Sequence, residues 1–408
     1  MRPLSLLSVF LSLTFFAEAE SMNTVQALEH ARRLLRSTPL IDAHNDLPDV
    51  IREKYARDVV AHDLRQRTSD DTDLVKLREG EVGAQFWSVY VPGSLKNGRF
   101  ARTQLEQIDI ARRMIAQYPE SLALALTADE IEKYFHAGKI ASLLGMEGGH
   151  VIENSLGALR AFYDLGVRYM TLTHFETIDW ADSATSPARH GGLSNFGKEV
   201  VREMNRLGML VDISHVSPET MADALDVSAA PVIFSHSSTR ALTDHPRNVP
   251  DHILKRLAEN GGVIMLSFIP AFVSQEVANW EPPLLGGETM EERDRKMQAL
   301  LAKGPRPQAT LRQVADHIEH ARKIAGVDHI GIGSDFYGST DMPKGLEDVS
   351  KYPYLFAELI QRGWGDQDLK KLAGQNLLRA MRQAEVVAAQ LRKIRPASTA
   401  LIEAMDAK

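Results

Sequence analysis

Seven side chains that can bind a metal ion or carry a proton stand at the ends of short apolar runs, namely His44, Asp46, Glu147, His174, His215, His236 and Asp335. The chain contains no cysteine, so a metal site must use nitrogen and oxygen ligands. Three imidazoles and two carboxylates form a donor set that suits Zn²⁺, with Mn²⁺ or Co²⁺ as alternatives: His44, Asp46, Glu147, His215 and His236. These five donors exceed the need of one tetrahedral zinc with an open position. Two ions that share a carboxylate fit better, and would hold a hydroxide between them.

Each of these motifs is weak when it is taken alone. His44-x-Asp46 is a common spacing, although side chains two apart in a strand point to the same side. Glu147 lies in GMEGGH, where the glycines let the backbone approach the carboxylate closely. The alternative is that each histidine is an ordinary strand-end residue that a backbone carbonyl satisfies. Because the residues stand at matching ends of different runs, their positions together favour metal binding over that alternative.

Eight apolar runs are bounded by turn residues, at 39–44, 82–91, 140–147, 167–174, 208–215, 231–236, 261–268 and 329–335. Segments with helical periodicity separate most of them, such as 217–228, where Ser217 can cap a helix and Pro218 can occupy its first turn. Runs that are apolar throughout indicate parallel strands covered on both faces. The count predicts an α/β fold, a (β/α)₈ TIM-type barrel with its chemistry at the C-terminal strand ends. A doubly wound open sheet is the alternative, but it would place polar ends at one switch point.

The chain is expected to be one barrel domain over 20–408, with a charged insertion at about 274–309. That insertion is rich in charge, Pro and Gly, which indicates either a solvated surface excursion or a lid over the strand ends. Residues 1–19 read as a signal peptide: Arg2 precedes the apolar stretch Leu4–Phe16, and small residues follow it. The stretch is short for a membrane anchor, which needs about 20 residues. We therefore expect an exported protein, periplasmic or secreted, with no stable membrane insertion.

The overall charge bears on the class of binding partner, and the remaining histidines can be assigned outside the predicted ligand set. Net charge is −7 without a block of basic residues, which argues against a nucleic-acid partner. His317 and His320 stand three apart on a predicted helix, and a solvated helix face explains them. His150 follows the glycines after Glu147, and we keep it as a candidate for supporting the metal ligands.

Several longer motifs follow one another along the chain: IDAHNDLP, GMEGGH, LTHFETIDWADS, VDISH, FSHSSTRALTDHPRNVPD, GIGSDFYG and GLEDVSKYP. Together they resemble the membrane dipeptidase family, also called renal dipeptidase, from about residue 39 to GQNLLR near 379. The most specific of them is SHSS followed by RNVPD. The resemblance implies a metal-dependent amidohydrolase-type barrel and, in soluble members, pairing as a homodimer.

The resemblance also implies a role for each matching residue. His44, Asp46 and Glu147 match the first zinc site of the family, and Glu147, His215 and His236 match the second, which makes Glu147 the bridging ligand. His174 in TLTHF matches the histidine that stabilises the oxyanion. Arg247 in PRNVP matches the residue that holds the substrate, and a guanidinium there suits a free carboxylate. Asp335 in GSDF matches the acid/base that relays the proton.

Two positions depart from the family pattern. Tyr337 stands where members commonly have a second Asp, so the surroundings of Asp335 differ in charge. Phe272 aligns with a substrate-contacting tyrosine of the mammalian relative, which removes one hydroxyl and about 1 kcal/mol of hydrogen bonding. Phe272 therefore joins Arg247 and His174 as a predicted substrate-binding residue.

These observations predict a zinc-dependent dipeptidase that holds two ions per chain and hydrolyses free dipeptides by attack of a metal-bridging hydroxide. The resemblance extends the prediction to substrates with a C-terminal D-residue. Two alternatives remain open at this point. One is a binuclear hydrolase of another amide, such as a cyclic amide or a β-lactam, and the other is a catalytically inactive metal-binding protein.

Overall fold

The computed structural model describes residues 23–95, 98–281 and 290–407, so the predicted signal peptide lies outside the described residues. Parallel strands close into one ring in the order β1, β2, β4, β5, β6, β7, β8 and β9, and β9 pairs back with β1. This arrangement confirms the predicted (β/α)₈ TIM-type barrel. The strands of the ring are β1 (Leu40–Asn45), β2 (Val82–Ser88), β4 (Ile140–Glu147), β5 (Val167–Thr171), β6 (Leu210–Asp212), β7 (Ile233–Ser237), β8 (Val263–Leu266) and β9 (Ile330–Ile332).

A further strand, β3 (Leu122–Leu124), was not expected from the sequence. It pairs with the first residues of β4, from Leu122 opposite Ile140 to Leu124 opposite Ser142. Strand β5 pairs with β4 only from Leu144 onward, so β3 and β5 occupy the same edge of β4 one after the other. Three residues are too few to show a strand pattern, so β3 could not be predicted from the sequence.

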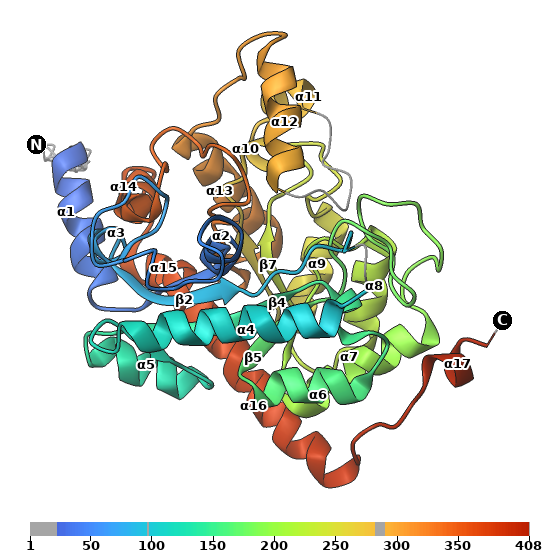
Figure 1. Cartoon of the computed structure of the whole chain (residues 1–408). Helices are drawn as coiled ribbons and strands as arrows, with labels where there is room; N and C mark the ends of the chain where they lie inside the picture. Colours follow the sequence, from blue (N-terminus) through green and yellow to red (C-terminus); the bar gives the residue numbers. More distant parts are fainter. Residues whose placement is uncertain (1–22, 96–97, 282–289, 408) are drawn as a thin grey trace, which may run out of the picture.

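Helices surround the barrel and fill the connections between strands (Figure 1). Ser217 accepts a hydrogen bond from Thr220 N, and Pro218 begins α8, which confirms the predicted helix start. The helices are α1 (Thr24–Leu35), α2 (Leu47–Lys54), α3 (Leu74–Glu79), α4 (Phe100–Gln117), α5 (Ala128–His136), α6 (Leu156–Asp164), α7 (Asn195–Leu207), α8 (Pro218–Val227), α9 (Asp251–Asn260), α10 (Pro270–Val273), α11 (Gln275–Trp280), α12 (Met290–Leu301), α13 (Leu311–Ala325), α14 (Tyr352–Gln361), α15 (Asp366–Lys370), α16 (Asn376–Ile394) and α17 (Ile402–Met405).

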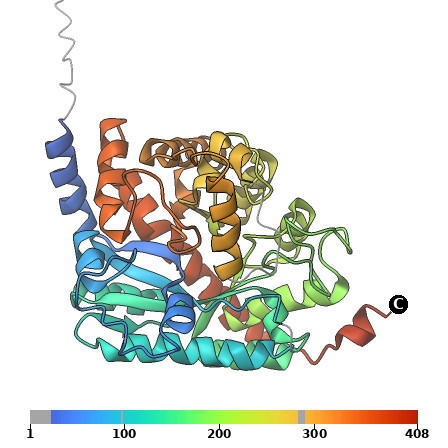
Figure 2. The same cartoon turned by 45° about the horizontal axis from the view of Figure 1, so that its top comes forward.

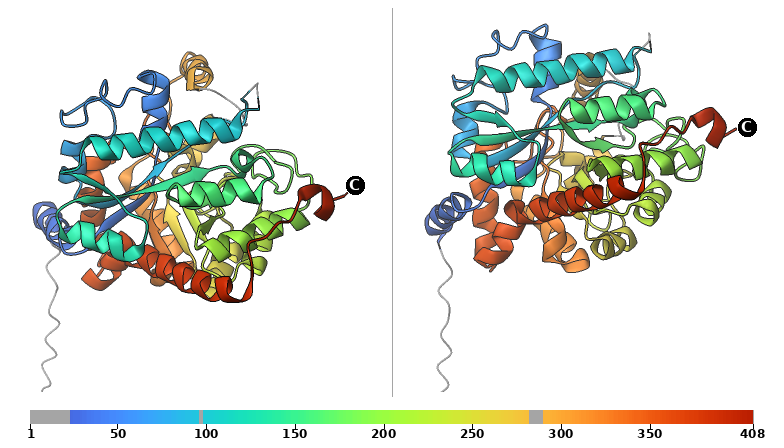
Figure 3. Two further views of the ribbon diagram at one scale, coloured as in Figure 1. Left: turned by 60° about the horizontal axis from the view of Figure 1, so that its bottom comes forward. Right: turned by 90° about the horizontal axis from the view of Figure 1, so that it is seen from below.

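The end of the barrel where the strands begin is closed by α16, which crosses the side of the molecule seen from below in Figure 3. Residues of α16, such as Leu377 and Met381, belong to the same buried cluster as Phe86 inside the barrel. One turn of π-helix, Lys371–Gln375, precedes α16 and lies directly against the start of β1. The opposite end, where the strands finish, is left for the functional site.

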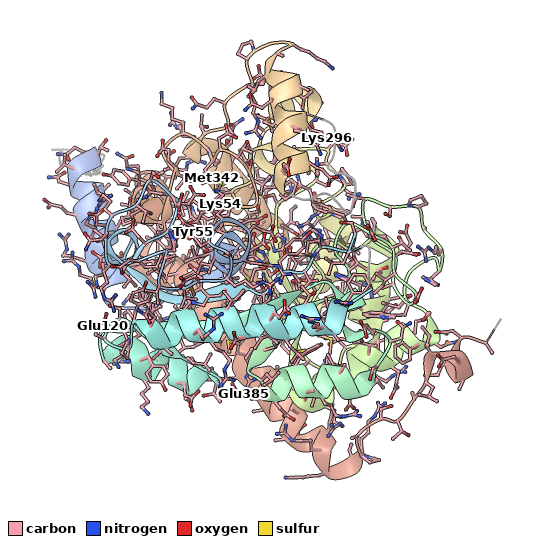
Figure 4. All side chains as sticks on the ribbon, in the orientation of Figure 1. Lys54, Tyr55, Glu120, Lys296, Met342 and Glu385 are labelled. Atoms are coloured by element: carbon pink, nitrogen blue, oxygen red, sulfur yellow. The ribbon has the colours of Figure 1, made fainter. Side chains whose placement is uncertain are left out.

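The charged segment predicted as an insertion rises above the finishing ends of the strands (Figure 2). Its described part contains α11 and α12, and Arg306 binds Glu281 with two hydrogen bonds, of 2.9 and 3.0 Å. Lys296 on α12 and Lys54 at the end of α2, both labelled in Figure 4, line the cavity described below. The segment therefore borders that cavity, as the lid alternative requires. Within the described ranges, no helix has the length and apolar character needed to cross a membrane.

Candidate active site and metal centre

A cavity of about 1030 Å³ opens where the barrel strands end. Its wall contains most of the predicted site residues, namely Asp46, Glu147, His174, His215, Arg247, Phe272 and Asp335. His44 and His236 lie beside these residues and are almost fully buried. The structure thus brings all nine predicted site residues into one region, although they come from segments spread over most of the chain.

Glu147, the last residue of β4, lies at the centre of this group. Its Oε1 is 3.1 Å from His215 Nε2 and 3.3 Å from His236 Nε2. Its Oε2 is 3.6 Å from His44 Nε2, on the other side of the carboxylate. Ser88 Oγ also donates to Oε2, at 3.4 Å. One oxygen of the carboxylate therefore faces His215 and His236 and the other faces His44, which is the arrangement expected of a bridging ligand.

His44 connects Glu147 to two further carboxylates. His44 Nε2 lies 3.4 Å from Asp46 Oδ1 and 4.0 Å from Asp335 Oδ1. Strand β1 ends at Asn45, so Asp46 reaches His44 because the chain turns there into α2 and not through strand alternation. Ligand atoms of three residues approach within 4.8 Å of one another in each of three sets: His44 with Glu147 and His236, Glu147 with His174 and His215, and His44 with Asp46 and Asp335.

The residues present fit divalent cations. His44 Nε2, Asp46 Oδ1 and His215 Nδ1 are buried atoms without a hydrogen-bond partner among the described residues. Buried polar atoms are normally paired, so these atoms indicate a missing partner. Three neighbouring carboxylates, those of Asp46, Glu147 and Asp335, also require positive charge nearby. Nitrogen and carboxylate donors are the ligands that zinc, manganese and cobalt accept.

The same crowding of charge shifts the pKa values of the central groups. Burial favours the neutral acid, yet the neighbouring imidazoles, His44 and His174 foremost, hold the pKa of Glu147 well below its usual range. Burial, together with the charges of Asp46 and Glu147, raises the pKa of Asp335 well above its usual range. Burial also lowers the pKa values of His215 and His236, which favours neutral imidazoles able to bind a metal.

Two of these residues are presented by strained backbone. His215 has φ 67° and Asp335 has φ 65°, in the left-handed region that residues other than glycine rarely adopt. Each follows the end of a strand by three residues, after β6 and β9 respectively. The chain is held in place there by Ala184 N, which donates to His215 O at 2.7 Å, and by Asp335 N, which donates to His44 O at 3.2 Å. Such strain is concentrated where the fold must aim a side chain.

Below the site, two fully buried aspartates tie the strand ends together. Asp42 on β1 accepts from Ser334 N and Ser334 Oγ, both at 2.7 Å. Asp212 on β6 accepts from Ser235 N at 2.8 Å and from Ser235 Oγ at 2.6 Å. The sequence interpretation missed both residues, although each lies two or three positions before a predicted ligand in IDAH and VDISH.

The hydrogen bonds of Ser235 also assign the protonation of His236. The carboxylate of Asp212 accepts the only hydroxyl proton of Ser235, at 2.6 Å. The 2.8 Å contact between Ser235 Oγ and His236 Nδ1 must then be donated by the ring nitrogen. The lone pair of the neutral ring is left on Nε2, which faces Glu147. The ring is thus fixed in the form that a metal ion requires.

Comparison with known proteins identifies the family. The chain matches the family described as Membrane dipeptidase (Peptidase family M19) over residues 28–395. The chain belongs to this family. It is 43% identical to rat dipeptidase 3 (Rattus norvegicus) over 364 residues, which cover 88% of this chain and 68% of the relative. The family resemblance and the enzyme class predicted from the sequence, a membrane dipeptidase-like metallopeptidase, are thereby confirmed.

Solved structures agree with the barrel of this dipeptidase family. The probable dipeptidase PvdM from Pseudomonas aeruginosa superposes with a TM-score of 0.78 at 26% identity, over 89% of this chain and all of that one. A metallopeptidase from Rhodobacter sphaeroides, solved with a phosphinate mimic of the dipeptide L-Ala-D-Ala, gives a TM-score of 0.71 at 24% identity. That match covers 85% of this chain and 99% of the other, and it shows the shared fold.

The predicted substrate-binding residues of the dipeptidase form one wall of the cavity. Arg247 is only 1% exposed, and its guanidinium lies 5.2 Å from the centre of the Phe272 ring. Nη2 of Arg247 donates to His236 O at 3.2 Å, which connects the substrate wall to a predicted metal ligand. Burial lowers the pKa of Arg247 to about 10, so the side chain stays charged at neutral pH.

His174 approaches the same oxygen of Glu147 as His215 and His236 do, with its Nε2 3.6 Å from Glu147 Oε1. Its ring packs against His215 and Phe175, at centroid distances of 4.3 and 4.0 Å. Tyr337, the departure next to Asp335, accepts a hydrogen bond from Thr72 N at 2.8 Å through its hydroxyl. The phenol therefore ties the loop after β9 to the loop that precedes α3.

Three other histidines have hydrogen-bond partners outside the predicted ligand set. His150 Nε2 contacts Val91 O at 3.0 Å, so the ring is held by the backbone. The assignment of His317 to a solvated helix face was wrong. His317 is 1% exposed, and its Nδ1 accepts from Thr239 N at 3.1 Å. His320, one turn later, contacts Asp251 near the surface, at 2.8 Å.

Proposed function

We propose that this protein hydrolyses free dipeptides with two zinc ions held by His44, Asp46, Glu147, His215 and His236. The observation that carries the proposal is the position of Glu147, whose Oε1 faces two of the proposed ligand imidazoles at 3.1 and 3.3 Å and whose Oε2 faces the third at 3.6 Å. A bridging carboxylate between two ions explains both sets at once. Membership of the dipeptidase family supports the same chemistry.

Such ions supply a nucleophile at neutral pH and polarise the bond under attack. Residues of the chain transfer the proton and stabilise the developing charge. Asp335, whose pKa is raised, takes a proton on Oδ1 from the attacking water and passes it to the leaving amine. His174 presents Nε2 to the carbonyl oxygen, where negative charge develops during the reaction. Both side chains line the cavity, so both can contact the substrate.

Arg247 binds the free carboxylate of the dipeptide. Its charged guanidinium lies in the cavity wall, and its planar fork matches a carboxylate. Phe272 supports it with an aromatic face at 5.2 Å. Placing the carboxylate here fixes the distance to the scissile bond, which selects dipeptides over longer chains. From family membership we further propose that a D-residue is accepted at the C-terminal position.

We also propose that the protein is exported, because 1–19 has the charge, apolar stretch and small residues of a signal peptide. Pairing as a homodimer stays a prediction from the family resemblance.

The test of function uses the mature protein after removal of metal by chelation. We expect hydrolysis of a dipeptide panel to disappear on chelation and to return when Zn²⁺ is added back, with close to two ions bound per chain. N-acetylated dipeptides and β-lactams serve as comparison substrates. Activity indifferent to chelation would contradict the proposal. Faster turnover of a lactam than of any dipeptide would instead favour a hydrolase of another amide, and metal binding without turnover would favour an inactive protein.

A further inference from the structure

Tyr169 on β5 reaches across the inside of the barrel to the predicted metal ligand on β1. Its hydroxyl lies 2.9 Å from His44 Nδ1 and 3.1 Å from the carbonyl oxygen of Ala43. Strands β2 and β4 stand between β1 and β5 in the ring, so the phenol reaches across the barrel interior to contact β1. Tyr169 is completely buried and is not among the residues that line the cavity.

Gly145 makes this crossing possible. A Cβ atom at Gly145 would lie 2.0 Å from Cζ of Tyr169 and 2.3 Å from its hydroxyl oxygen, which is closer than any real contact. The ring of Phe86 packs on Tyr169 at a centroid distance of 5.1 Å. The position of the hydroxyl is therefore set by the absence of a side chain on β4 and by an aromatic neighbour on β2.

The hydrogen bonds of the Tyr169 hydroxyl determine which ring nitrogen of His44 carries the proton and which can accept a metal ion. A carbonyl oxygen has no hydrogen, so the 3.1 Å bond to Ala43 O must use the hydroxyl proton of Tyr169. The 2.9 Å contact with His44 Nδ1 must then be donated by the ring nitrogen. When the ring is neutral, as a metal ligand must be, Nε2 is left as the acceptor, and it faces Asp46 and Glu147 at 3.4 and 3.6 Å.

We propose that Tyr169 is a positioning residue for His44, which orients the ring and keeps Nε2 available for a metal ion. The inference rests on the proposed metal site. It is parallel to the role of Ser235 on His236, where a serine hydroxyl also accepts from Nδ1. Hydrogen bonds to the second ring nitrogen commonly change metal affinity 10- to 100-fold.

The test compares Tyr169→Phe with Tyr118→Phe. Tyr118 is also fully buried, and its hydroxyl also bonds to the backbone, accepting from Leu64 N at 2.9 Å and donating to His62 O at 3.3 Å. Metal-stripped parent and variants are titrated with Zn²⁺ against a chromophoric chelator, and thermal unfolding of the stripped proteins reports their stability. We expect Tyr169→Phe to bind one ion roughly 10- to 100-fold more weakly, and Tyr118→Phe to bind as the parent does.

A purely structural role would lower the unfolding temperature of Tyr169→Phe without moving the chelator competition, and would overturn the proposal. If the parent protein bound no ion, both the proposed metal site and the proposed role of Tyr169 would be refuted. The parent gives an independent test through ¹⁵N-labelled histidine, with the His44 signals assigned by their loss in His44→Asn. The proposal requires a proton on Nδ1 and metal ligation at Nε2 in the Zn²⁺-loaded protein, and the reverse pattern would refute it.

Discussion

Asp335 Oδ1 lies 4.0 Å from His44 Nε2, although Asp335 follows the last strand of the barrel and His44 lies on the first. Closure of the ring through the pairing of β9 with β1 brings them together. Asp335 N also donates to His44 O at 3.2 Å, so the acid is fixed to the metal-binding strand by its own backbone. The carboxyl group that we propose as the proton carrier is thereby held beside the predicted metal centre.

Replacing Asp335 with Asn should remove the proton carrier and preserve the shape of the site. We expect kcat to fall by roughly 10²- to 10⁴-fold, while the number of bound ions stays the same. The measurement is steady-state kinetics on one dipeptide across pH, with metal analysis of the same samples. Unchanged turnover would show that Asp335 does not relay the proton.

Replacing Arg247 with Lys keeps the positive charge but loses the planar pair of donors. A hydrogen bond to a charged group contributes about 1.5–3 kcal/mol, so kcat/KM should fall by roughly 10- to 100-fold, mostly through KM. Arg240→Lys is the matched control, because Arg240 lies on the same segment and donates to Pro246 O. In Arg247→Lys, kcat/KM should fall less for dipeptide amides, which lack the free carboxylate, than for free dipeptides. An equal loss for both would mean that Arg247 does not bind the carboxylate.

Because His317 is buried, we expect the folded protein to lose stability in acid. Burial lowers its pKa to about 4 from an ordinary value of 6.5, so below pH 6.5 the unfolded chain binds a proton that the folded chain does not. Its contribution is complete above pH 6.5 and is lost as pH falls toward 4, by about 3 kcal/mol in all. His317→Asn keeps an acceptor for Thr239 N and should lose less stability between pH 7 and pH 4.5 than the parent, in urea unfolding.

His320→Asn serves as the control for that comparison, since His320 lies one turn later on α13 and contacts Asp251 near the surface. It should follow the pH dependence of the parent. If His317→Asn also followed the parent, the buried imidazole would not be a source of the acid sensitivity.

The sequence predicted the ring of strands and the grouping of the chemical residues, because parallel strands in a barrel finish at one end. His44, Glu147 and His236 are recognisable by their places at the ends of apolar runs. Tyr169 was not recognisable, since its role depends on the gap at Gly145 and on a contact 125 residues away.

The burial of single polar residues could not be predicted from the sequence either. His317 stands on an amphipathic helix whose polar spacing fits a surface, yet it faces Thr239 inside the protein. Strand β3 could not be predicted for the same reason. It exists through its pairing with β4, and three residues are too few for their own sequence to specify that pairing.

Removing divalent ions should lower the stability of the folded protein. Asp46, Glu147 and Asp335 are neighbouring carboxylates in a buried site, and bound cations would relieve their mutual repulsion. Ions that bind only the folded state stabilise it by about 2.7 kcal/mol at a free concentration of 100 times Kd. We expect chelation to lower the Tm by several degrees and Zn²⁺ to restore it. Mg²⁺ should restore much less, because it prefers oxygen ligands and three of the five proposed ligands here are the imidazoles of His44, His215 and His236. Full recovery with Mg²⁺ alone would contradict a site built around imidazole ligands.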